Sequence, residues 1–536
     1  MLQHTPEPQG HFVPAGPLQW GKSAVLEAIQ HLEQPFALVR GESGVGAGFR
    51  GVTTLGGPPT SGALPLLAWV PALPPERLGD PSFQMVYGTR YSYVAGEMAN
   101  GIGSAEMVIA MAKAGMIGFF GSGGLSTERV RTAVERIQSE LGDLPYGFNL
   151  IHSPQDPRQE QALVDLYLEK GVRTVCAAAF MSLTPAVVHY RAAGLSRNGS
   201  EIHVSNRLIA KVSREEVATH FLAPAPEKIL RALVEQGKIT AEQAELARQV
   251  PMADDLTAEA DSGGHTDNRA SFVLIPLMLM LRDRMRAEHG YTQIVRVGAA
   301  GGISTPQAVA AAFALGAAYV VTGTVNQACI EAGTSDLAKS LLAQAGAADV
   351  DMAPASDMFE AGVKVQVLKR GTMFSRRGER LYEIWREYSS LDAIPSDERQ
   401  KLEEQILRRP AEDVWKDCVS FFSERDPAQL ERAEREPKHK LALIFRWYLG
   451  MSSRWAIAGV EDRKLDTQIW CGPAIGAFNA WTRGTFLAEP ANRRVATVAA
   501  NLLAGAAAIT RSRWLNAQGI DLGPEALAWT PRPINE

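Results

Sequence analysis

Short runs of apolar residues recur along the middle of the chain, separated by longer segments with apolar and charged residues at helical spacing. Short apolar runs that end in small residues are typical of buried strands, and the longer segments predict helices. Eight such pairs follow one another between residues 87 and 330, which predicts a parallel sheet with helices outside it. The predicted strands lie in RYSYVAGEMAN, MIGFFGSGG, YGFNLIHS, VRTVCAAAF, HVSNRLIAKVSR, DLTAEADSGG, IVRVGAAGG and AYVVTGT.

An α/β fold of the closed TIM (β/α)8 barrel type is favoured over an open sheet, because phosphate-binding signals fall at strands seven and eight. We assign the barrel to residues 86–345. Residues 220–252 exceed what one crossover helix needs, and we expect a helical insertion lying over the barrel mouth. The apolar run at 272–281 is too short to span a bilayer, which takes about 20 residues, and predicts a buried helix.

The segments before and after the barrel differ from it in residue composition and in the elements they predict. Residues 1–85 predict an N-terminal extension with a helix at 23–32, a strand at 35–41 and then loops with many Gly and Pro. Eight of the ten tryptophans lie beyond residue 380, among charged helical runs. Residues 346–536 therefore predict a C-terminal, mostly helical domain with an aromatic core.

Composition and charge limit the class of protein and the partners that this chain is expected to have. The 536 residues are 46% hydrophobic and 21% charged, as in ordinary soluble proteins. A net charge of -5 without a basic stripe argues against nucleic acid as a partner. The start carries no secretory signal pattern, and four scattered cysteines indicate reduced thiols, so we expect a cytoplasmic protein without a membrane partner. Asp254, Asp255 and Asp261 lack the spacing of a metal site, and we predict no metal.

The ends of strands seven and eight predict a phosphate cradle. Gly301 and Gly302 end the seventh run, and the sequence Ser304-Thr305-Pro306 behind them is a helix start. A helix N-terminus presents free N–H groups and partial positive charge to an anion. Gly323 and Thr324 repeat the arrangement one strand later. These loops form the standard phosphate site of a (β/α)8 barrel.

Three polar residues point to a ligand beside that cradle. His265 follows Gly263-Gly264 at the end of strand six, and an unperturbed imidazole pKa near 6.5 suits proton donation. Asn149 and Lys211 sit inside otherwise apolar strands, where a polar side chain needs a partner. A ring with hydrogen-bonding edges would supply one, and structural hydrogen bonding explains them equally well.

The span EADSGGHT followed by VGAAGGISTPQAVAAAFALGAAYVVTGT resembles the FMN-dependent nitronate monooxygenase and enoyl reductase superfamily. The stretches VYGTRYSYVAGEMANGIGSAEMVIAMAKAGMIGFFGSGGLS, FEAGVKVQVLKRGTMFSRRGERLYEIW and QIWCGPAIGAFNAW make the resemblance narrower. They look like the PfaD family, whose members are trans-acting enoyl reductases of polyunsaturated fatty acid and polyketide synthases.

The resemblance implies FMN as cofactor, NADPH or NADH as hydride donor, and an enoyl thioester on an acyl carrier protein as substrate. It implies that His265 is catalytic, near the reacting carbons, with proton donation by His265 as a hypothesis. It also implies a set of FMN contacts: Ala95, Gly96, Glu97 and Gly264 by their backbone at the ring, Asn149 and Lys211 at its edge, and Gly301, Gly302, Gly323 and Thr324 at the phosphate.

Two other functions stay open. One is a nitronate monooxygenase-like oxidoreductase on a free small molecule, and the other is a non-catalytic docking scaffold in a synthase complex. The densest basic cluster comprises Lys369, Arg370, Arg376, Arg377 and Arg380, which fits an acidic carrier protein or a solvated helix face. The oligomeric state does not follow from the sequence, and a homodimer stays open.

Overall fold

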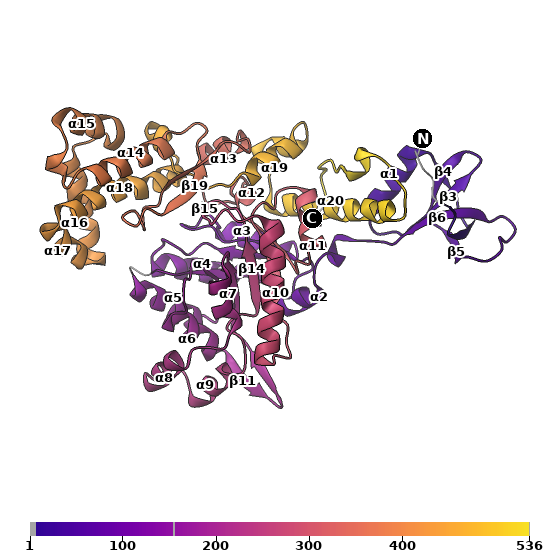
Figure 1. Ribbon diagram of the computed structural model, residues 1–536, viewed down its shortest axis with the longest axis horizontal. Coiled ribbons are helices and arrows are strands. Elements are labelled where there is room, and N and C mark those ends of the chain that lie inside the picture. Colours follow the sequence, from indigo (N-terminus) through magenta and orange to yellow (C-terminus); the bar gives the residue numbers. More distant parts are fainter. Residues whose placement is uncertain (1–6, 154–155, 535–536) are drawn as a thin grey trace.

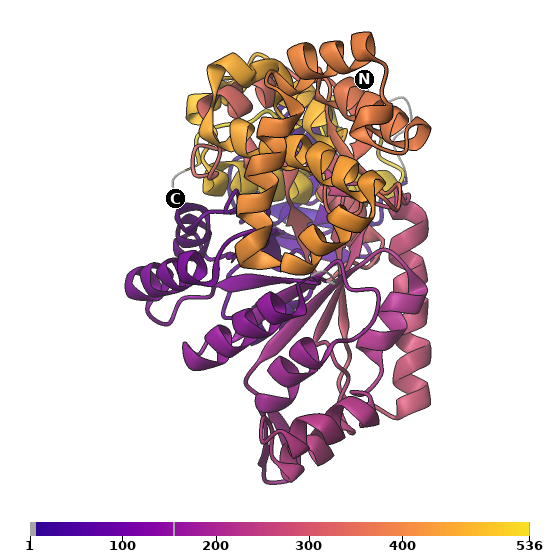
Figure 2. The same cartoon turned by 90° about the vertical axis from the view of Figure 1, so that its left-hand side faces the viewer.

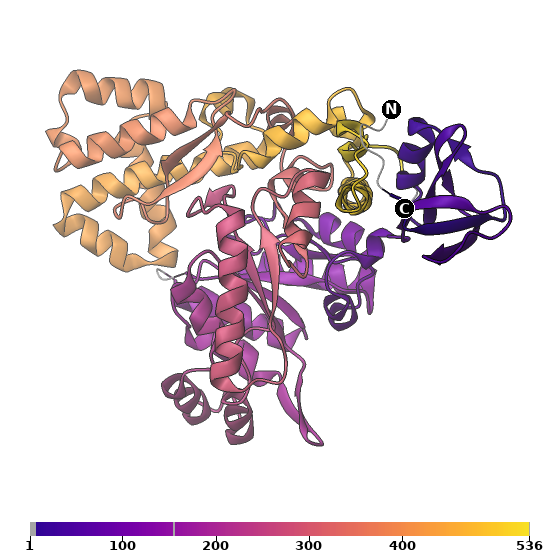
Figure 3. The same ribbon diagram turned by 45° about the vertical axis from the view of Figure 1, so that its right-hand side comes forward.

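The computed structural model describes residues 7–153 and 156–534. A small sheet at the N-terminal end and a helical region lie at opposite ends of the molecule, and the barrel lies between and below them (Figures 1 and 3). The domain boundaries given above, between residues 85 and 86 and between residues 345 and 346, remain predictions.

The barrel strands are β7 (Tyr93–Ala95), β8 (Ile117–Phe120), β9 (Gly147–Ile151), β10 (Thr174–Ala178), β13 (Arg207–Val212), β14 (Asp255–Glu259), β16 (Arg296–Ala300) and β17 (Val320–Thr322). They close in the order β10-β13-β14-β16-β17-β7-β8-β9. The parallel pair of β17 with β7, in which Thr322 lies opposite Ala95, completes the ring. Each predicted run holds one barrel strand, so the barrel prediction is confirmed.

The bottom of the barrel is filled by a buried ion pair. Asp255 is fully buried and accepts hydrogen bonds from Arg296 at 2.6 and 2.8 Å. The hydroxyl of Tyr87, at the end of helix α2 (Pro81–Tyr87), donates to the same carboxylate at 2.5 Å. Because successive strand residues point to opposite faces, Asp255, Thr257 and Glu259 share the inner face of β14. Glu259, at the carboxyl end, therefore belongs to the mouth.

Helices cover the outside of the barrel: α3 (Ala105–Lys113), α4 (Thr127–Leu141), α5 (Pro157–Glu169), α6 (Pro185–Ala193), α7 (Glu215–Leu222), α10 (Ser271–His289) and α11 (Pro306–Ala314). Ser104, Ser126, Thr184 and Thr305 each cap a helix through a side-chain oxygen that accepts a backbone N–H. Helix α10 corrects the expectation of a buried helix, because Phe272 is 71% exposed and Met280 63% exposed. Its opposite face, with Leu274 and Met278, is buried.

The helical insertion is present, but its predicted place over the mouth is wrong. Helices α8 (Glu227–Glu235) and α9 (Ala241–Ala247) follow the end of α7 and precede the start of β14. Gln243 donates to the carbonyl of Ala193, at the end of α6. Helix α9 also packs against the hairpin of β11 (Leu195–Asn198) and β12 (Glu201–Val204). The insertion therefore lies at the amino ends of the strands, opposite the mouth (Figure 1).

The N-terminal segment is a sheet rather than mostly loops. Its elements are β1 (Gly10–Pro14), β2 (Gln19–Trp20), α1 (Lys22–Gln30), β3 (Phe36–Gly41), β4 (Gly44–Gly48), β5 (Gly51–Leu55) and β6 (Leu64–Val70), and the strand order is β2-β4-β3-β6-β1-β5. The predicted helix and the strand at 35–41 are confirmed. Glycine disguised β4: a Cβ at Gly46 would lie 2.6 Å from the ring of Trp20, so this strand packs against the ring through a residue without a side chain.

The helical region contains α12 (Thr324–Gln327), α13 (Asp336–Ala343), α14 (Phe374–Glu387), α15 (Ser396–Lys401), α16 (Ala411–Arg425), α17 (Pro427–Arg435), α18 (Pro437–Ala458), α19 (Ala474–Thr482) and α20 (Val495–Ala517). It stands above the barrel strands (Figure 2). An aromatic core forms as predicted, with Phe445 and Tyr448 buried and Trp385, Trp415 and Trp447 packed against it.

Helix α20 returns to the rest of the molecule. It packs along α11, and Arg511 donates to the carbonyls of Ile29, His31 and Gln34 in the N-terminal segment. Among the described residues, it is the one helix long and apolar enough to cross a membrane, but 89% of its most apolar window is buried within the protein. We interpret α20 as a core helix that joins the barrel to the N-terminal sheet.

Candidate functional site

The loops after β16 and β17 lie side by side at the barrel mouth and leave backbone uncovered. Gly301 and Gly302 have φ angles of 80° and 75°, which glycine adopts without strain. A Cβ at Gly302 would meet only the hydroxyl of Ser271, at 3.9 Å, and a Cβ at Gly323 would meet nothing within 4 Å. Helix α11 begins directly behind the first loop, where Thr305 caps it. The two loops thus offer open backbone beside a helix N-terminus.

Gly301 has a packing role that Gly302 and Gly323 lack. An added Cβ at Gly301 would lie 2.6 Å from the carbonyl carbon of Ala260 and 2.8 Å from the carbonyl oxygen of Asp261. The seventh strand's loop is therefore pressed against the loop after β14. Of the glycines predicted to contact a phosphate here, Gly302 and Gly323 are the ones whose surroundings leave room for one.

A charged cluster occupies the inner face of the mouth. Lys211 Nζ lies 2.8 Å from Glu97 Oε1 and 3.3 Å from Glu259 Oε1. Burial alone would lower the pKa of Lys211, but the two carboxylates outweigh it and raise that pKa above its usual value. Lys211 therefore stays an ammonium. Its ion pairs with Glu97 and Glu259 use two of its three N–H groups, and the third can bind a ligand.

The predicted contacts on the first strands are more enclosed. Ala95 is fully buried, and Gly96 donates its N–H to Thr322 O at 2.9 Å. A Cβ on Gly96 would lie 2.8 Å from Val321 Cγ1, which explains the glycine. Asn149 is 1% exposed and donates to the carbonyl of Cys176 at 3.3 Å. For Asn149 the structure thus supplies a structural hydrogen bond, the alternative that the sequence had left open.

His265 lies at the rim, in the short strand β15 (Gly264–His265), which pairs with β19 (Lys364–Leu368). Its side chain is 42% exposed, and Nε2 lies 3.4 Å from Oδ1 of Asp357. Burial acts to lower the pKa of His265, but the carboxylate of Asp357, helped by Glu259, raises it above its usual value. The imidazole is therefore accessible, and its pairing with Asp357 favours the protonated form.

A segment from the far end of the chain covers the loop that carries His265. Residues Trp470, Cys471 and Gly472 form this mouth strap. A Cβ on Gly263 would lie 2.7 Å from Cα of Cys471, and the ring of Trp470 lies 3.9 Å from the Cβ position of Gly264. The N–H of Gly472 donates to Thr324 Oγ1 at 3.3 Å. The mouth strap thus connects the His265 loop to the loop after β17.

The aspartates weighed as metal ligands have other partners. Asp254 pairs with Arg191 at 2.7 Å, Asp255 lies in the ion pair at the bottom of the barrel, and Asp261 accepts from Gln366 at 2.9 Å. Within residues 7–153 and 156–534, no group of three His, Cys, Asp or Glu side chains is placed to hold a metal ion.

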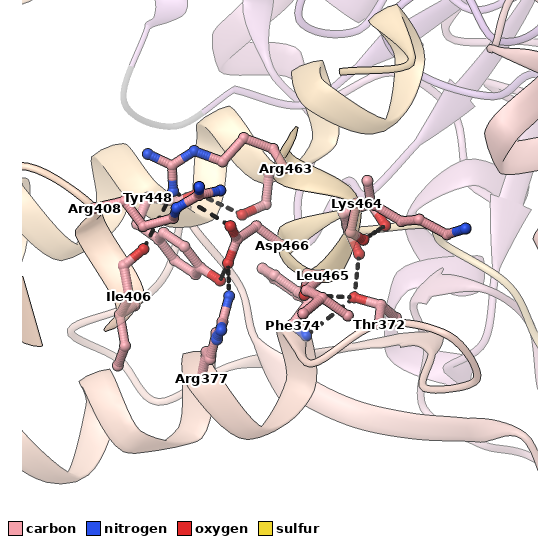
Figure 4. A network of polar contacts seen from close by, with 12 residues as sticks. Thr372, Phe374, Arg377, Ile406, Arg408, Tyr448, Arg463, Lys464, Leu465 and Asp466 are labelled. Atoms are coloured by element: carbon pink, nitrogen blue, oxygen red, sulfur yellow. Dashed lines mark hydrogen bonds and ion pairs between the residues drawn. The ribbon is translucent and has the colours of Figure 1, made fainter. Parts of the chain in front are cut away.

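Most of the predicted basic cluster is neutralised. Arg377 pairs with the buried Asp466, which also accepts from Tyr448 at 2.8 Å and from Arg463 at 3.3 Å (Figure 4). Arg380 and Arg370 pair with Glu398 and Asp349. Lys369 and Arg376 remain as exposed cations. This network fixes the helical region internally and leaves a weaker basic surface than the sequence suggested.

Sequence reasoning missed Glu259, Asp357 and the mouth strap. Glu259 had a signal, because it ends a strand whose alternate residues, Asp255 and Thr257, are also polar. Asp357 and the strap had none, since they reach the mouth through pairing over long sequence separations: Gly264 lies opposite Gln366, and Val367 bridges Trp470.

Two family descriptions match the chain. Residues 84–375 match "Nitronate monooxygenase", and residues 388–467 match "[Acyl-carrier-protein] S-malonyltransferase, inserted helical domain". The second match falls within the helical region that includes Asp466.

Curated relatives and a solved structure extend these matches. A polyunsaturated fatty acid synthase protein of Thraustochytrium sp. is 51% identical over 465 residues, which are 85% of this chain and 31% of that protein. Polyketide biosynthesis protein PksE of Bacillus subtilis is 48% identical over 440 residues, 82% of this chain and 57% of that protein. The chain thus spans less than two thirds of either relative. The crystal structure of the enoyl reductase domain of MlnA, from the macrolactin biosynthesis cluster of Bacillus amyloliquefaciens, aligns with a TM-score of 0.79 at 38% identity, over 83% of this chain and 100% of that one.

Proposed function

This chain belongs to the nitronate monooxygenase family and, within it, to the PfaD-type enoyl reductases, and from this we propose its function. We propose that it is an FMN-dependent enoyl reductase. It acts in trans on carrier-bound enoyl thioesters during polyketide or polyunsaturated fatty acid biosynthesis. NADPH, or NADH, is the proposed hydride donor. We place this activity in the cytoplasm, with the acyl carrier protein of a synthase as partner.

One observation carries the proposal: open backbone at Gly302 and Gly323 lies on the loops after the seventh and eighth strands, where barrels of this type hold phosphate. An added atom at either position meets at most the hydroxyl of Ser271, at 3.9 Å, and α11 would add the partial charge of its N-terminus to a bound phosphate. The donor set therefore fits an FMN phosphate.

The remaining side chains fit the ring and the thioester. A bound FMN would supply hydride transfer between the nicotinamide and the β-carbon of the enoyl group. Lys211 would hold the ring edge with its third N–H, since Glu97 and Glu259 already engage the other two. His265, protonated beside Asp357, would donate a hydrogen bond to the thioester oxygen and stabilise the negative charge that develops there. The mouth strap covers the loop that carries His265 and would shield one side of the mouth from water.

A carrier partner fits the geometry of the entrance. The acyl arm must reach the mouth from outside, and His265 is exposed at its rim. The names of the two curated relatives place them in polyunsaturated fatty acid and polyketide synthesis, where acyl chains stay on carriers. We therefore propose a carrier-bound rather than a free thioester, without assigning a chain length.

The proposal is tested with purified protein, NADPH and a crotonyl thioester. We expect bound flavin and NADPH oxidation that depends on the thioester. His265→Ala should keep FMN and lose turnover, and wild-type turnover by this variant would refute the role given to His265. A protein that purifies without flavin and cannot be reconstituted would favour the docking scaffold.

A second function is supported by the family description over residues 84–375, which names nitronate monooxygenase. That activity would consume oxygen with a nitroalkane and would not require a carrier. Oxygen uptake with nitroethane in the absence of NADPH, together with no reduction of a crotonyl thioester, would favour it over the enoyl reductase.

A further inference from the structure

The barrel mouth holds two carboxylates for one ammonium. Glu97, beyond the end of β7, and Glu259, at the end of β14, both face Lys211 of β13, at 2.8 and 3.3 Å. Cys176 of β10 donates its thiol to Glu97 at 3.4 Å, and the hydroxyl of Ser262 donates to Glu259 at 3.3 Å. With both carboxylates ionised the cluster would carry a net charge of about -1 in a poorly solvated place, which is unfavourable.

The two carboxylates are not equivalent. Glu97 is 6% exposed and is enclosed by Lys211 and Cys176, whereas Glu259 is 23% exposed. The hydrogen bonds and ion pairs of Glu259 to described residues use Oε1, which leaves Oε2 for a proton. Burial raises the pKa of Glu259 above its usual value; Lys211 opposes this rise, and the charge of Glu97 adds to it. Two interacting carboxylates share their protons, and Glu259 is the member that faces the open mouth.

Reduction of an enoyl group needs a proton as well as a hydride. The hydride forms a C–H bond at the β-carbon and leaves an electron pair at the α-carbon and the thioester. A proton must then leave an acid, and the α-carbon electron pair forms the second C–H bond. His265 is already paired through Nε2 with Asp357, and this suits a hydrogen bond to the thioester better than full loss of its proton.

We propose that Glu259, held between Lys211 and Ser262, is a second proton-holding side chain of the mouth and delivers the proton to the α-carbon. This inference rests on the proposed enoyl reductase function. The carboxylic acid of Glu259 loses its proton and becomes a carboxylate, and the adjacent ammonium of Lys211 stabilises that charge. The reduced nicotinamide supplies the hydride, and the next proton comes from water through the exposed side of Glu259.

The test compares Glu259→Gln with Glu97→Gln, which removes the other carboxylate of the same lysine. In infrared difference spectra of the full-length protein at neutral pH, we expect a protonated carboxyl band that Glu259→Gln loses and Glu97→Gln keeps. Glu259→Gln should reduce a crotonyl thioester about 10²- to 10⁴-fold more slowly than wild type, the usual contribution of a general acid. Bleaching of the flavin by NADPH takes no proton from Glu259 and should slow far less than thioester reduction.

Other results separate the inference from the function. Wild-type turnover by Glu259→Gln with an unchanged pH profile would overturn the inference and leave the enoyl reductase standing. If both variants lose thioester reduction equally and no carboxyl band distinguishes them, the cluster has only a structural role. That result would also overturn the inference. No thioester reduction by the wild-type protein would overturn both. If Glu259→Gln does not fold, Glu259→Asp keeps an acid and should retain the band and part of the rate, and loss of both would overturn the inference.

Discussion

Replacing Gly323 by alanine separates the proposed phosphate contact from the packing of the barrel. Gly323 has a negative φ of -124°, and a Cβ there meets nothing within 4 Å. We therefore expect the free energy of unfolding to change by about 1 kcal/mol or less. The methyl group would occupy the space into which a phosphate oxygen must come to reach the backbone N–H groups. Losing one charge-assisted hydrogen bond costs about 1.5–3 kcal/mol. The dissociation constant for FMN should thus rise roughly 10- to 150-fold.

The assay is a titration of the flavin-free protein with FMN, followed by flavin fluorescence, alongside chemical denaturation of the same samples. Gly301→Ala is the matched control, because its Cβ would lie 2.6 Å from the backbone of Ala260 at a φ of 80°. That variant should lose folding stability, by about 1–3 kcal/mol from the backbone strain alone. Wild-type FMN affinity in a stable Gly323→Ala protein would refute the phosphate site on this loop.

Three other outcomes follow from the structure. Asp255→Asn leaves a buried guanidinium without its carboxylate and should lower the free energy of unfolding by about 3–5 kcal/mol, measured by urea denaturation; a loss below about 1 kcal/mol would contradict the buried pair. Asp357→Asn removes the group that raises the pKa of His265, so the fall in activity at high pH, where the imidazole loses its proton, should begin at lower pH than in wild type; an unchanged kcat/KM profile would contradict that pairing. Gly263→Ala would bring a Cβ within 2.7 Å of Cys471 and displace the mouth strap, which protease sensitivity around residues 470–472 should reveal, whereas wild-type resistance would argue against that contact.

Local patterns made the barrel predictable. Each strand is a short buried run, and the helices behind it begin at capping residues such as Ser104 and Thr305, so sequence and structure agree element by element. The prediction of phosphate-binding loops rests on glycines beside a helix start, and the structure places these loops side by side at the mouth. Part of the N-terminal sheet was hidden because β4 is rich in glycine, with Gly46 leaving room for Trp20, and glycine is a poor marker of strands.

The rest depends on contacts between distant parts of the chain. The strand that carries His265 has two residues and no pattern of its own, and it exists because β19 pairs with it about a hundred residues later. The mouth strap and Asp357 arrive in the same way. The insertion of residues 220–252 was helical as expected, but nothing in its composition shows which end of the barrel it covers. The sequence overstated the positive charge of the predicted basic cluster, because the acidic residues that pair with it, such as Asp466, lie far away in sequence.

In the proposed function, the mouth of this barrel binds FMN and reduces carrier-bound enoyl thioesters. The most direct measurement is single-turnover mass spectrometry of a crotonyl-loaded acyl carrier protein, mixed with the FMN-loaded protein and NADPH. We predict a gain of two hydrogens by the acyl group, with stoichiometric NADPH oxidation. An unchanged crotonyl group on the carrier, in the presence of flavin that NADPH does bleach, would contradict the account.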